Sequence, residues 1–207
     1  MAHVPASERR PQLIQAAIEL MSREGVAAGS TRAIAAELGV AQATVHYTFG
    51  TKKDLYRAVV EQLTAEFIGQ VRAAAPDEGP FGEQIAAMVH ALWDSAVGEG
   101  GHCALMSEFA ALAIRDPDLQ EIMRALQHEI ESTAAELLTA LAEAHGQPLA
   151  MSAHEISVVF LAGFNGLTDR YLLLRAAGEE PEQESRRALD LLVATTVGLC
   201  LGAPAAT

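Results

Sequence analysis

A run of polar and basic side chains between residues 39 and 53 carries the clearest chemical signal of this sequence. It reads GVAQATVHYTFGTKK and ends in Lys52 and Lys53, the two lysines of the 207-residue chain. A glutamine such as Gln42 can form two hydrogen bonds with adenine. A lysine at a helix start can bind phosphate together with the free N–H groups there. The run therefore holds groups that nucleic-acid recognition uses.

The charge of the chain is unevenly distributed. The net charge of −13 taken alone argues against a polyanionic partner. Residues 1–53, however, carry six basic and four acidic side chains, whereas residues 54–207 carry 8 basic and 23 acidic ones. This asymmetry predicts a small basic head on a large acidic body, with both lysines at the end of the head.

Motifs for other chemistry are missing from the sequence. It contains no G-x-S-x-G, P-loop or dinucleotide fingerprint, so we expect neither an enzyme nor a bound cofactor. The seven histidines do not stand at metal-ligand spacing on one helix, and His102 beside Cys103 is a weak hint. The sequence predicts no metal site.

Cysteine usage and hydropathy point to the cytoplasm. Cys103 and Cys200 lie far apart, so we expect reduced thiols rather than a disulfide. No stretch of 18 uninterrupted apolar residues is present, and the first twelve residues lack the apolar segment of a secretory signal. A cytoplasmic protein without a membrane partner is the expectation.

The elements that must position the 39–53 run are short helices. Apolar spacing predicts a first helix over about 11–23, with Pro11 at its first position unless Ser7 caps an extra turn upstream. Thr31 is the expected N-cap of a second helix, and Gly39 suits the left-handed position after it. A third helix follows over about 42–49. The pattern is typical of a helix-turn-helix, although any corner of two helices can produce it.

The rest of the chain also predicts helices. The T-x-x-D sequence of Thr51 and Asp54 is a capping box that opens a long helix, Asp116 caps another, and Ser152 with Glu155 forms a further capping box. Nothing alternates with the period of a strand, so we expect an all-α fold. The later helices are predicted over about 82–97, 104–114, 117–144, 153–176 and 181–201.

The last two predicted helices carry apolar residues on several sides. The run ALDLLVATTVGLCLG, within the final helix, is apolar nearly all round. A helix of this kind must be covered on several sides, and a second subunit is one natural cover in a chain of this size. The alternative is a buried central helix of a monomer.

Residues 31–60, TRAIAAELGVAQATVHYTFGTKKDLYRAVV, resemble the DNA-binding head of the TetR family of transcriptional regulators. The resemblance covers about residues 10–60 and is specific for the head, whereas the remainder resembles the family only in layout. The residues that carry the likeness are Ile34-Ala35, Gly39-Val40, Phe49, Lys52 and Leu55.

The resemblance implies a fold, a domain organisation and a function. It implies an all-α protein with a three-helix helix-turn-helix DNA-binding domain over 1–53 and a helical effector-binding and dimerisation domain over 54–207. Such a protein would be a ligand-responsive regulator, expected to be a repressor that binds a palindromic double-stranded DNA operator as a homodimer. Its recognition helices would lie about 34–36 Å apart, and a small molecule would release it from DNA.

The resemblance also implies which residues contact DNA. Short side chains at the start of the recognition helix would reach base edges, where Gln42 can pair with adenine and the methyl groups of Ala43 and Thr44 can touch thymine. His46, Tyr47, Lys52, Lys53 and Arg32 would contact phosphates. The expected DNA-binding residues are thus Arg32, Gln42, Ala43, Thr44, His46, Tyr47, Lys52 and Lys53.

Three positions depart from the family pattern. Tyr is usual where this chain has His46, His or Tyr where it has Thr48, and Ser where it has Ala41. An alanine N-cap costs about 0.5–2 kcal/mol of helix stability. His and Thr can still donate hydrogen bonds to phosphate, but individual base contacts do not transfer directly from the family.

An effector pocket is expected in the body. Candidate lining residues are the larger apolar and lone polar groups on inward stripes, although each could equally belong to the core. Asn165 stands out, because an amide on an apolar helix face needs a partner. The candidates are His90, Trp93, Met106, Phe109, Met123, Gln127, Phe160, Phe164 and Asn165.

Two other functions stay open at this point. The departures at residues 41, 46 and 48 would suit a helical small-molecule-binding protein or enzyme with a vestigial DNA-binding head. A regulator controlled by a protein partner, without a small ligand, is the other alternative. A closed body without a cavity would favour that last function.

Overall fold

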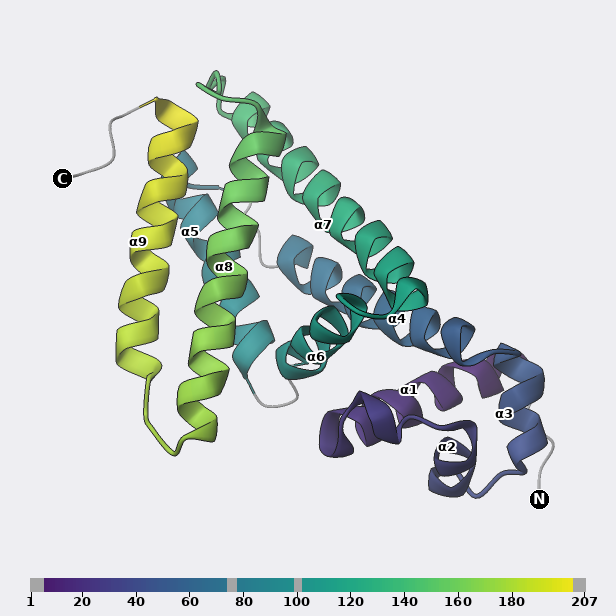
Figure 1. Ribbon diagram of the computed structural model, residues 1–207. Coiled ribbons are helices and arrows are strands. Elements are labelled where there is room, and N and C mark those ends of the chain that lie inside the picture. Colours follow the sequence, from purple (N-terminus) through teal and green to yellow (C-terminus); the bar gives the residue numbers. More distant parts are fainter. Residues whose placement is uncertain (1–5, 74–77, 99–101, 203–207) are drawn as a thin grey trace. The chain divides into compact units, whose positions relative to one another are not determined.

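Helices are the regular elements of the structure, a computed structural model that describes residues 6–73, 78–98 and 102–202 (Figure 1). This confirms the all-α fold class. The chain forms two compact units: unit 1 comprises Met1–Ala65 and Ala104–Leu126, and unit 2 comprises Glu66–Cys103 and Gln127–Thr207. Neither unit is continuous in sequence, and the domain boundary expected after residue 53 stays a prediction.

Unit 1 contains the helix-turn-helix. Its buried side chains come from every one of its segments, so the short helices are fixed by a shared core. The fully buried ones include Leu13, Ile18, Val26, Ile34, Val45, Leu55, Val59 and Phe109. The elements are α1 (Ala6–Glu24), a 3-10 turn η1 (Val26–Ala28), α2 (Thr31–Glu37), α3 (Gln42–Phe49), the first part of α4 (Lys52–Ala73), most of α6 (Cys103–Ala113) and the start of α7 (Pro117–Ala144).

Two helix starts differ from the sequence prediction. Ser30, not Thr31, is the N-cap of α2, because its extended backbone lets its hydroxyl accept a hydrogen bond from the Ala33 N–H at 3.2 Å. Helix α1 begins at Ala6 rather than at Pro11. Pro11 is tolerated in the second turn, where its missing N–H removes one hydrogen bond near the helix start.

Other local predictions are confirmed. Gly39 has a φ of 64°, which a residue with a side chain rarely adopts, and it ends the turn between α2 and α3. The Asp54 N–H donates to the Thr51 hydroxyl at 3.1 Å at the start of α4. Asp116 accepts from the N–H of Asp118 at 3.0 Å at the start of α7. As expected, α3 has Ala41 at its N-cap position and no side-chain cap.

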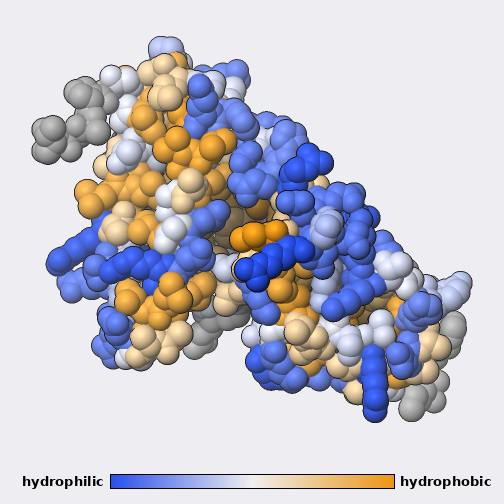
Figure 2. All heavy atoms as spheres, viewed as in Figure 1, coloured by the Kyte–Doolittle hydropathy of each residue, from blue (hydrophilic) through white to orange (hydrophobic). Residues whose placement is uncertain are grey.

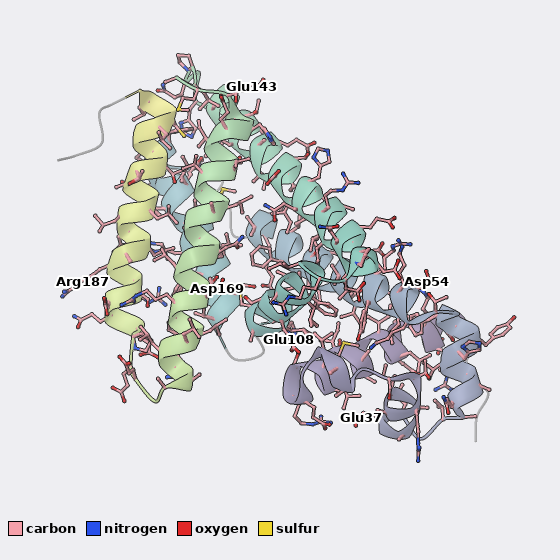
Figure 3. All side chains as sticks on the ribbon, viewed as in Figure 1. Glu37, Asp54, Glu108, Glu143, Asp169 and Arg187 are labelled. Atoms are coloured by element: carbon pink, nitrogen blue, oxygen red, sulfur yellow. The ribbon has the colours of Figure 1, made fainter. Side chains whose placement is uncertain are left out.

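The backbone of Val26 is held from two sides within unit 1, on one of them by Glu108 of α6, which Figure 3 labels. Its N–H donates to the Glu108 carboxylate of α6 at 3.0 Å, and its carbonyl oxygen accepts from the Tyr56 hydroxyl of α4 at 3.2 Å. The Tyr56 ring meets the ring of Phe109 edge-on, with centroids 5.3 Å apart. Helices α4 and α6 therefore fix the turn that leads from α1 into the helix-turn-helix.

Unit 2 contains α5 (Phe81–Val97), α8 (Ala153–Ala176) and α9 (Glu182–Leu201), with the ends of α4 and α7. Helices α8 and α9 lie side by side and antiparallel (Figure 1). Ser152 and Glu155 form the predicted capping box of α8. At Gly163 the two helices approach closely, since a Cβ there would lie 2.7 Å from a methyl group of Leu192.

Aromatic side chains build the core of unit 2. The ring of Trp93, 2% exposed, meets Phe164 and Tyr171 edge-on, with centroids 6.1 and 5.5 Å away. Each such pair adds about 0.5–1.5 kcal/mol beyond the burial of its area. In the part of the chain that the structure describes, no helix has the length and hydropathy that a bilayer crossing requires.

The Val26 contact predicts the effect of removing Glu108. Glu108→Ala leaves a half-buried N–H without its acceptor, so we expect the free energy of unfolding of unit 1 to fall by about 1–3 kcal/mol in urea denaturation. Glu143→Ala is the control, because Glu143 is an exposed glutamate on α7 in unit 2. Equal effects of the two substitutions would contradict a specific role of the Glu108 hydrogen bond.

Candidate DNA-binding surface and effector cavity

One side of α3 faces the core and the other faces solvent. Val45 is fully buried and Phe49 is 6% exposed, so they anchor the helix in unit 1. The Arg10 guanidinium lies 5.7 Å from the centre of the Phe49 ring and adds a cation–π contact. Gln42, Ala43, His46 and Tyr47, four of the expected DNA-binding residues, are exposed. The helix therefore presents its polar residues outward.

Tyr47 is the most exposed of the large hydrophobic side chains in the part of the chain that the structure describes. It is 92% exposed, so its ring and its hydroxyl are open to contact with a partner. Thr44 is half-buried, and its carbonyl oxygen accepts a hydrogen bond from the Thr48 hydroxyl at 2.8 Å. Thr48, one of the departures from the family pattern, thus directs its hydroxyl to the helix backbone.

The start of α3 is connected to α2 by a side-chain hydrogen bond. The Gln42 amide donates to the hydroxyl of Thr31 at 3.2 Å, so the expected base-reading residue is held at the N-terminal end of α2. Arg32, the neighbour of Thr31, is exposed. The expected contacts of Gln42 with bases and of Arg32 with phosphate stay predictions, with both side chains open to solvent.

The two lysines have different surroundings. Lys52 is exposed, and its ammonium nitrogen lies 4.9 Å from the centre of the Tyr56 ring. Lys53 is more buried and pairs with Asp118 at 3.0 Å and Glu121 at 2.7 Å, both on α7. The Glu121 hydrogen bond, more than that of Asp118, raises the pKa of Lys53, and the Lys53 hydrogen bond lowers the pKa of Glu121. Both groups are therefore charged at neutral pH, and the ammonium group of Lys53 already has two carboxylate partners.

The two cysteines and the potential metal-ligating side chains can be located in the structure. No cluster of three metal-ligating side chains occurs among residues 6–73, 78–98 and 102–202. Cys103 and Cys200 are free thiols. Burial raises the pKa of the Cys103 thiol to about 11, so it stays protonated and a poor nucleophile at neutral pH.

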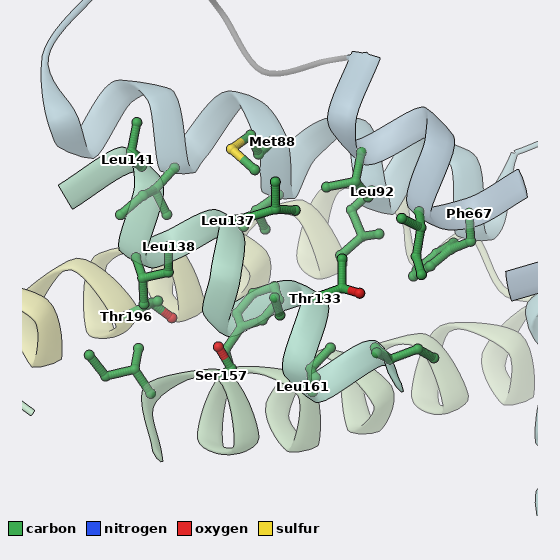
Figure 4. A pocket seen from close by; sticks show the side chains of 18 residues that line it. Phe67, Met88, Leu92, Thr133, Leu137, Leu138, Leu141, Ser157, Leu161 and Thr196 are labelled. Atoms are coloured by element: carbon green, nitrogen blue, oxygen red, sulfur yellow. The ribbon is translucent and has the colours of Figure 1, made fainter. Parts of the chain in front are cut away.

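A cavity of about 110 Å³ lies in unit 2 (Figure 4). Side chains from the end of α4 and from α5, α7, α8 and α9 surround it, and nearly all of them are hydrocarbon. The polar ones are the hydroxyl residues Thr133, Ser157 and Thr196. The apolar ones include Phe67, Met88, Leu92, Leu138, Leu141 and Phe160.

The residues expected to line a ligand site are dispersed in the structure. Phe160 is the member of that set that lines this cavity. Trp93 and Phe164 belong to the aromatic core of unit 2. His90 pairs with Asp190 of α9 at 2.9 Å.

The remaining members of the expected set lie elsewhere. Gln127 and Asn165 are exposed, so the Asn165 amide faces solvent rather than an apolar interior. Met106, Phe109 and Met123 belong to unit 1, where Phe109 supports Tyr56. Of these five residues, Gln127 and Asn165 face solvent, Phe109 is buried in the core of unit 1, and Met106 and Met123 are half-buried in that unit.

Helix α7 supplies lining residues that the sequence analysis missed. Its apolar side chains recur every three or four residues, which is the spacing of one helix face. That periodicity could have identified the face, but it does not show which helices oppose it. The lining residues on α7 are Ile130, Thr133, Ala134, Leu137, Leu138 and Leu141.

Apolar side chains also remain exposed on α8 and α9. Leu173 and Leu191 are 72% and 70% exposed, and Figure 2 shows hydrophobic side chains gathered over these two helices. Arg170 of α8 pairs with Glu184 of the same chain at 2.8 Å. Other exposed apolar residues of the two helices are Val158, Val159 and Leu201.

Known proteins with similar sequences are bacterial regulators. The nicotine-responsive transcriptional repressor HdnoR of Paenarthrobacter nicotinovorans is 30% identical over 69% of this chain and 74% of its own length. The transcriptional regulator BetI of Brucella canis is 29% identical over 66% of this chain and 71% of its own. A solved structure described as a transcriptional regulator from Saccharomonospora viridis in complex with choline has a TM-score of 0.72 at 19% identity. It covers 90% of this chain and 96% of its own.

Two family descriptions match the chain and together cover most of it. Residues 13–59 match the bacterial regulatory proteins of the tetR family, and residues 81–198 match the C-terminal domain of BetI-type transcriptional repressors. The first range contains α2 and α3, and the second contains α5, α8 and most of α9. The chain therefore belongs to the TetR family and is a ligand-responsive, DNA-binding transcriptional repressor.

Proposed function

We propose that two copies of this chain bind a palindromic operator and that a small molecule in the unit 2 cavity releases them. The observation that carries the proposal is the outward face of α3, where Gln42, Ala43, His46 and Tyr47 are exposed opposite the buried Val45 and Phe49. A helix presented in this way can enter the major groove of DNA.

The proposed contacts divide into base reading and phosphate binding. Gln42 and Ala43 at the start of α3 read base edges, and Thr44 adds a methyl contact. Tyr47 and His46 donate to phosphates, as does Lys52 at the first turn of α4, where free N–H groups also favour an anion. Phosphate contacts supply much of the affinity and make it depend on salt.

The proposed dimer forms through α8 and α9. Their exposed apolar side chains would be covered by the same surface of a second copy around a two-fold axis. A dimer brings two copies of α3 to an operator with two half-sites. In this proposal the protein acts in the cytoplasm, where the DNA is accessible.

The proposed effector site is the cavity lined by α4, α5, α7, α8 and α9. Support comes from the relatives, one of which responds to nicotine and another of which is solved with choline. Effector and operator would bind to different conformations of the dimer. By thermodynamic linkage, operator binding must then weaken effector binding by the same factor.

Removing the charge of Lys52 tests the DNA contact. We expect Lys52→Ala to weaken binding of the dimer to duplex DNA from immediately upstream of the gene by about tenfold or more. The slope of log affinity against log salt should fall by about 2, because each of the two copies loses one phosphate contact. Fluorescence anisotropy at several salt concentrations measures both. Arg72→Ala, which removes one exposed charge from the last turn of α4, should leave the slope unchanged. The phosphate role of Lys52 fails if both variants change the slope equally.

Releasing Lys53 from its carboxylate partners should strengthen DNA binding. In the Asp118→Asn, Glu121→Gln double variant the Lys53 ammonium becomes available to phosphate, and we expect an affinity gain of about three- to tenfold at low salt. The Glu129→Gln, Glu136→Gln double variant makes the same charge change at exposed positions of α7. An equal gain in both would show a general charge effect and no role for Lys53.

A charge placed on α9 tests the dimer. We expect Leu191→Glu to shift the protein from dimer to monomer in sedimentation velocity, because two carboxylates would be buried in the apolar contact. Ile114→Glu is the control, since Ile114 is 78% exposed but lies in unit 1. A Leu191→Glu protein that stays dimeric at micromolar concentration would rule out this face as the interface.

A further inference from the structure

The lining of the unit 2 cavity contains no charged side chain. All 18 lining residues lie in the described part of the chain, and none is Asp, Glu, Lys, Arg or His. We propose that the cavity binds an uncharged, hydrocarbon-rich molecule with one hydroxyl-type polar group and that it excludes organic cations. This inference rests on the proposed function, because it names the ligand class of the same site.

A cation in this cavity would lose its hydration without gaining a counter-charge. The transfer of an unpaired ion into an apolar interior costs several kcal/mol even after relaxation. A buried carboxylate could offset that cost, but the ion pairs of α7 and α9 are on exposed side chains such as Glu121 and Asp190. Neither residue lines the cavity.

Aromatic faces offer another way to bind a cation, and here they are few. The aromatic lining residues are Phe67 and Phe160, and phenylalanine attracts cations less strongly than tryptophan does. The rings of Trp93 and Tyr171 pack against each other in the core of unit 2 and do not line the cavity. The structure therefore lacks a cage of aromatic faces around this space.

The polar groups of the lining are hydroxyls, which are neutral donors and acceptors. The Thr196 hydroxyl donates to the Leu192 carbonyl at 2.8 Å, so it can still accept a hydrogen bond from a ligand. Ser157, which is 4% exposed, and Thr133 supply two further hydroxyls (Figure 4). Such groups can form hydrogen bonds with a hydroxyl or carbonyl group of a ligand. They provide no counter-charge for an ion.

The size of the cavity limits the ligand. An engineered apolar cavity of about 150 Å³ holds one benzene molecule, so a space of about 110 Å³ takes a ligand of similar or slightly smaller size. The flexible thioether of Met88 and the leucines of α7 allow modest adjustment. A branched six-carbon alcohol is somewhat larger than benzene, so it would fit only with that adjustment.

Two isosteric compounds separate shape from charge. Choline carries a trimethylammonium group on a two-carbon alcohol, and 3,3-dimethyl-1-butanol replaces its nitrogen by carbon, which removes the charge and keeps the shape. Isothermal titration calorimetry of the full-length protein with each compound measures its affinity. A second measurement determines whether each compound releases fluorescent operator DNA from the protein. We expect the neutral alcohol to bind at least about tenfold more tightly than choline.

A substitution within the cavity locates the binding. Ala134 of α7 lines the cavity, so Ala134→Phe should fill the space and abolish binding of the alcohol. Ala140→Phe makes the same change at an exposed position of the same helix and should retain binding. If Ala134→Phe does not fold by circular dichroism, the smaller Ala134→Leu takes its place.

The outcomes distinguish the ligand class from the proposed function. Choline binding as tightly as the alcohol, and lost in Ala134→Phe, would overturn the ligand class and keep the cavity as the effector site. Tighter binding of the alcohol in the cavity without release of DNA would support the ligand class and contradict the effector role. Binding of neither compound would overturn the ligand class, and binding of the alcohol that survives Ala134→Phe would overturn the cavity as the binding site.

Discussion

The two hydrogen bonds on the backbone of Val26 are the constraint on which unit 1 depends. Glu108 of α6 holds the N–H and Tyr56 of α4 holds the carbonyl oxygen, and Phe109 supports the Tyr56 ring. The 3-10 turn between α1 and α2 is short, and its own hydrogen bonds are few. Residues more than 80 positions later in the sequence therefore determine how the helix-turn-helix is held. This is why α6, outside the first 60 residues, packs as part of the N-terminal unit.

The proposed DNA-binding surface and the cavity differ in the polarity of their side chains. The outer face of α3 and the start of α4 are polar, and even there the charge of Lys53 is matched by two carboxylates of α7. The cavity of unit 2 has no charged side chain. An acidic chain can bind a polyanion only if its carboxylates lie away from the contact surface or are paired with cationic side chains. Asp118 and Glu121, which pair with Lys53, are paired in this way. The sign of the net charge consequently says little about either ligand.

Features that depend on a few neighbouring residues could be predicted from the sequence. The left-handed Gly39, the caps at Thr51, Asp116 and Ser152, and the uncapped start of α3 all follow from local hydrogen bonding. The N-cap of α2 was misplaced by one residue, because Ser30 and Thr31 are both good caps. The cavity could not be predicted, because it depends on which faces of five helices oppose one another. A stripe of apolar residues looks the same whether it lines a cavity, as Phe160 does, or fills a core, as Phe164 does.

Trp93 is the single tryptophan of the chain, and it lies in the aromatic core of unit 2. Its fluorescence emission therefore reports on the packing of that unit, whereas helical circular dichroism reports on both units together. The two signals coincide during denaturation if the units unfold as one cooperative block. They separate if unit 1 unfolds first, so the placement of one indole ring makes the cooperativity between the two units measurable without any label.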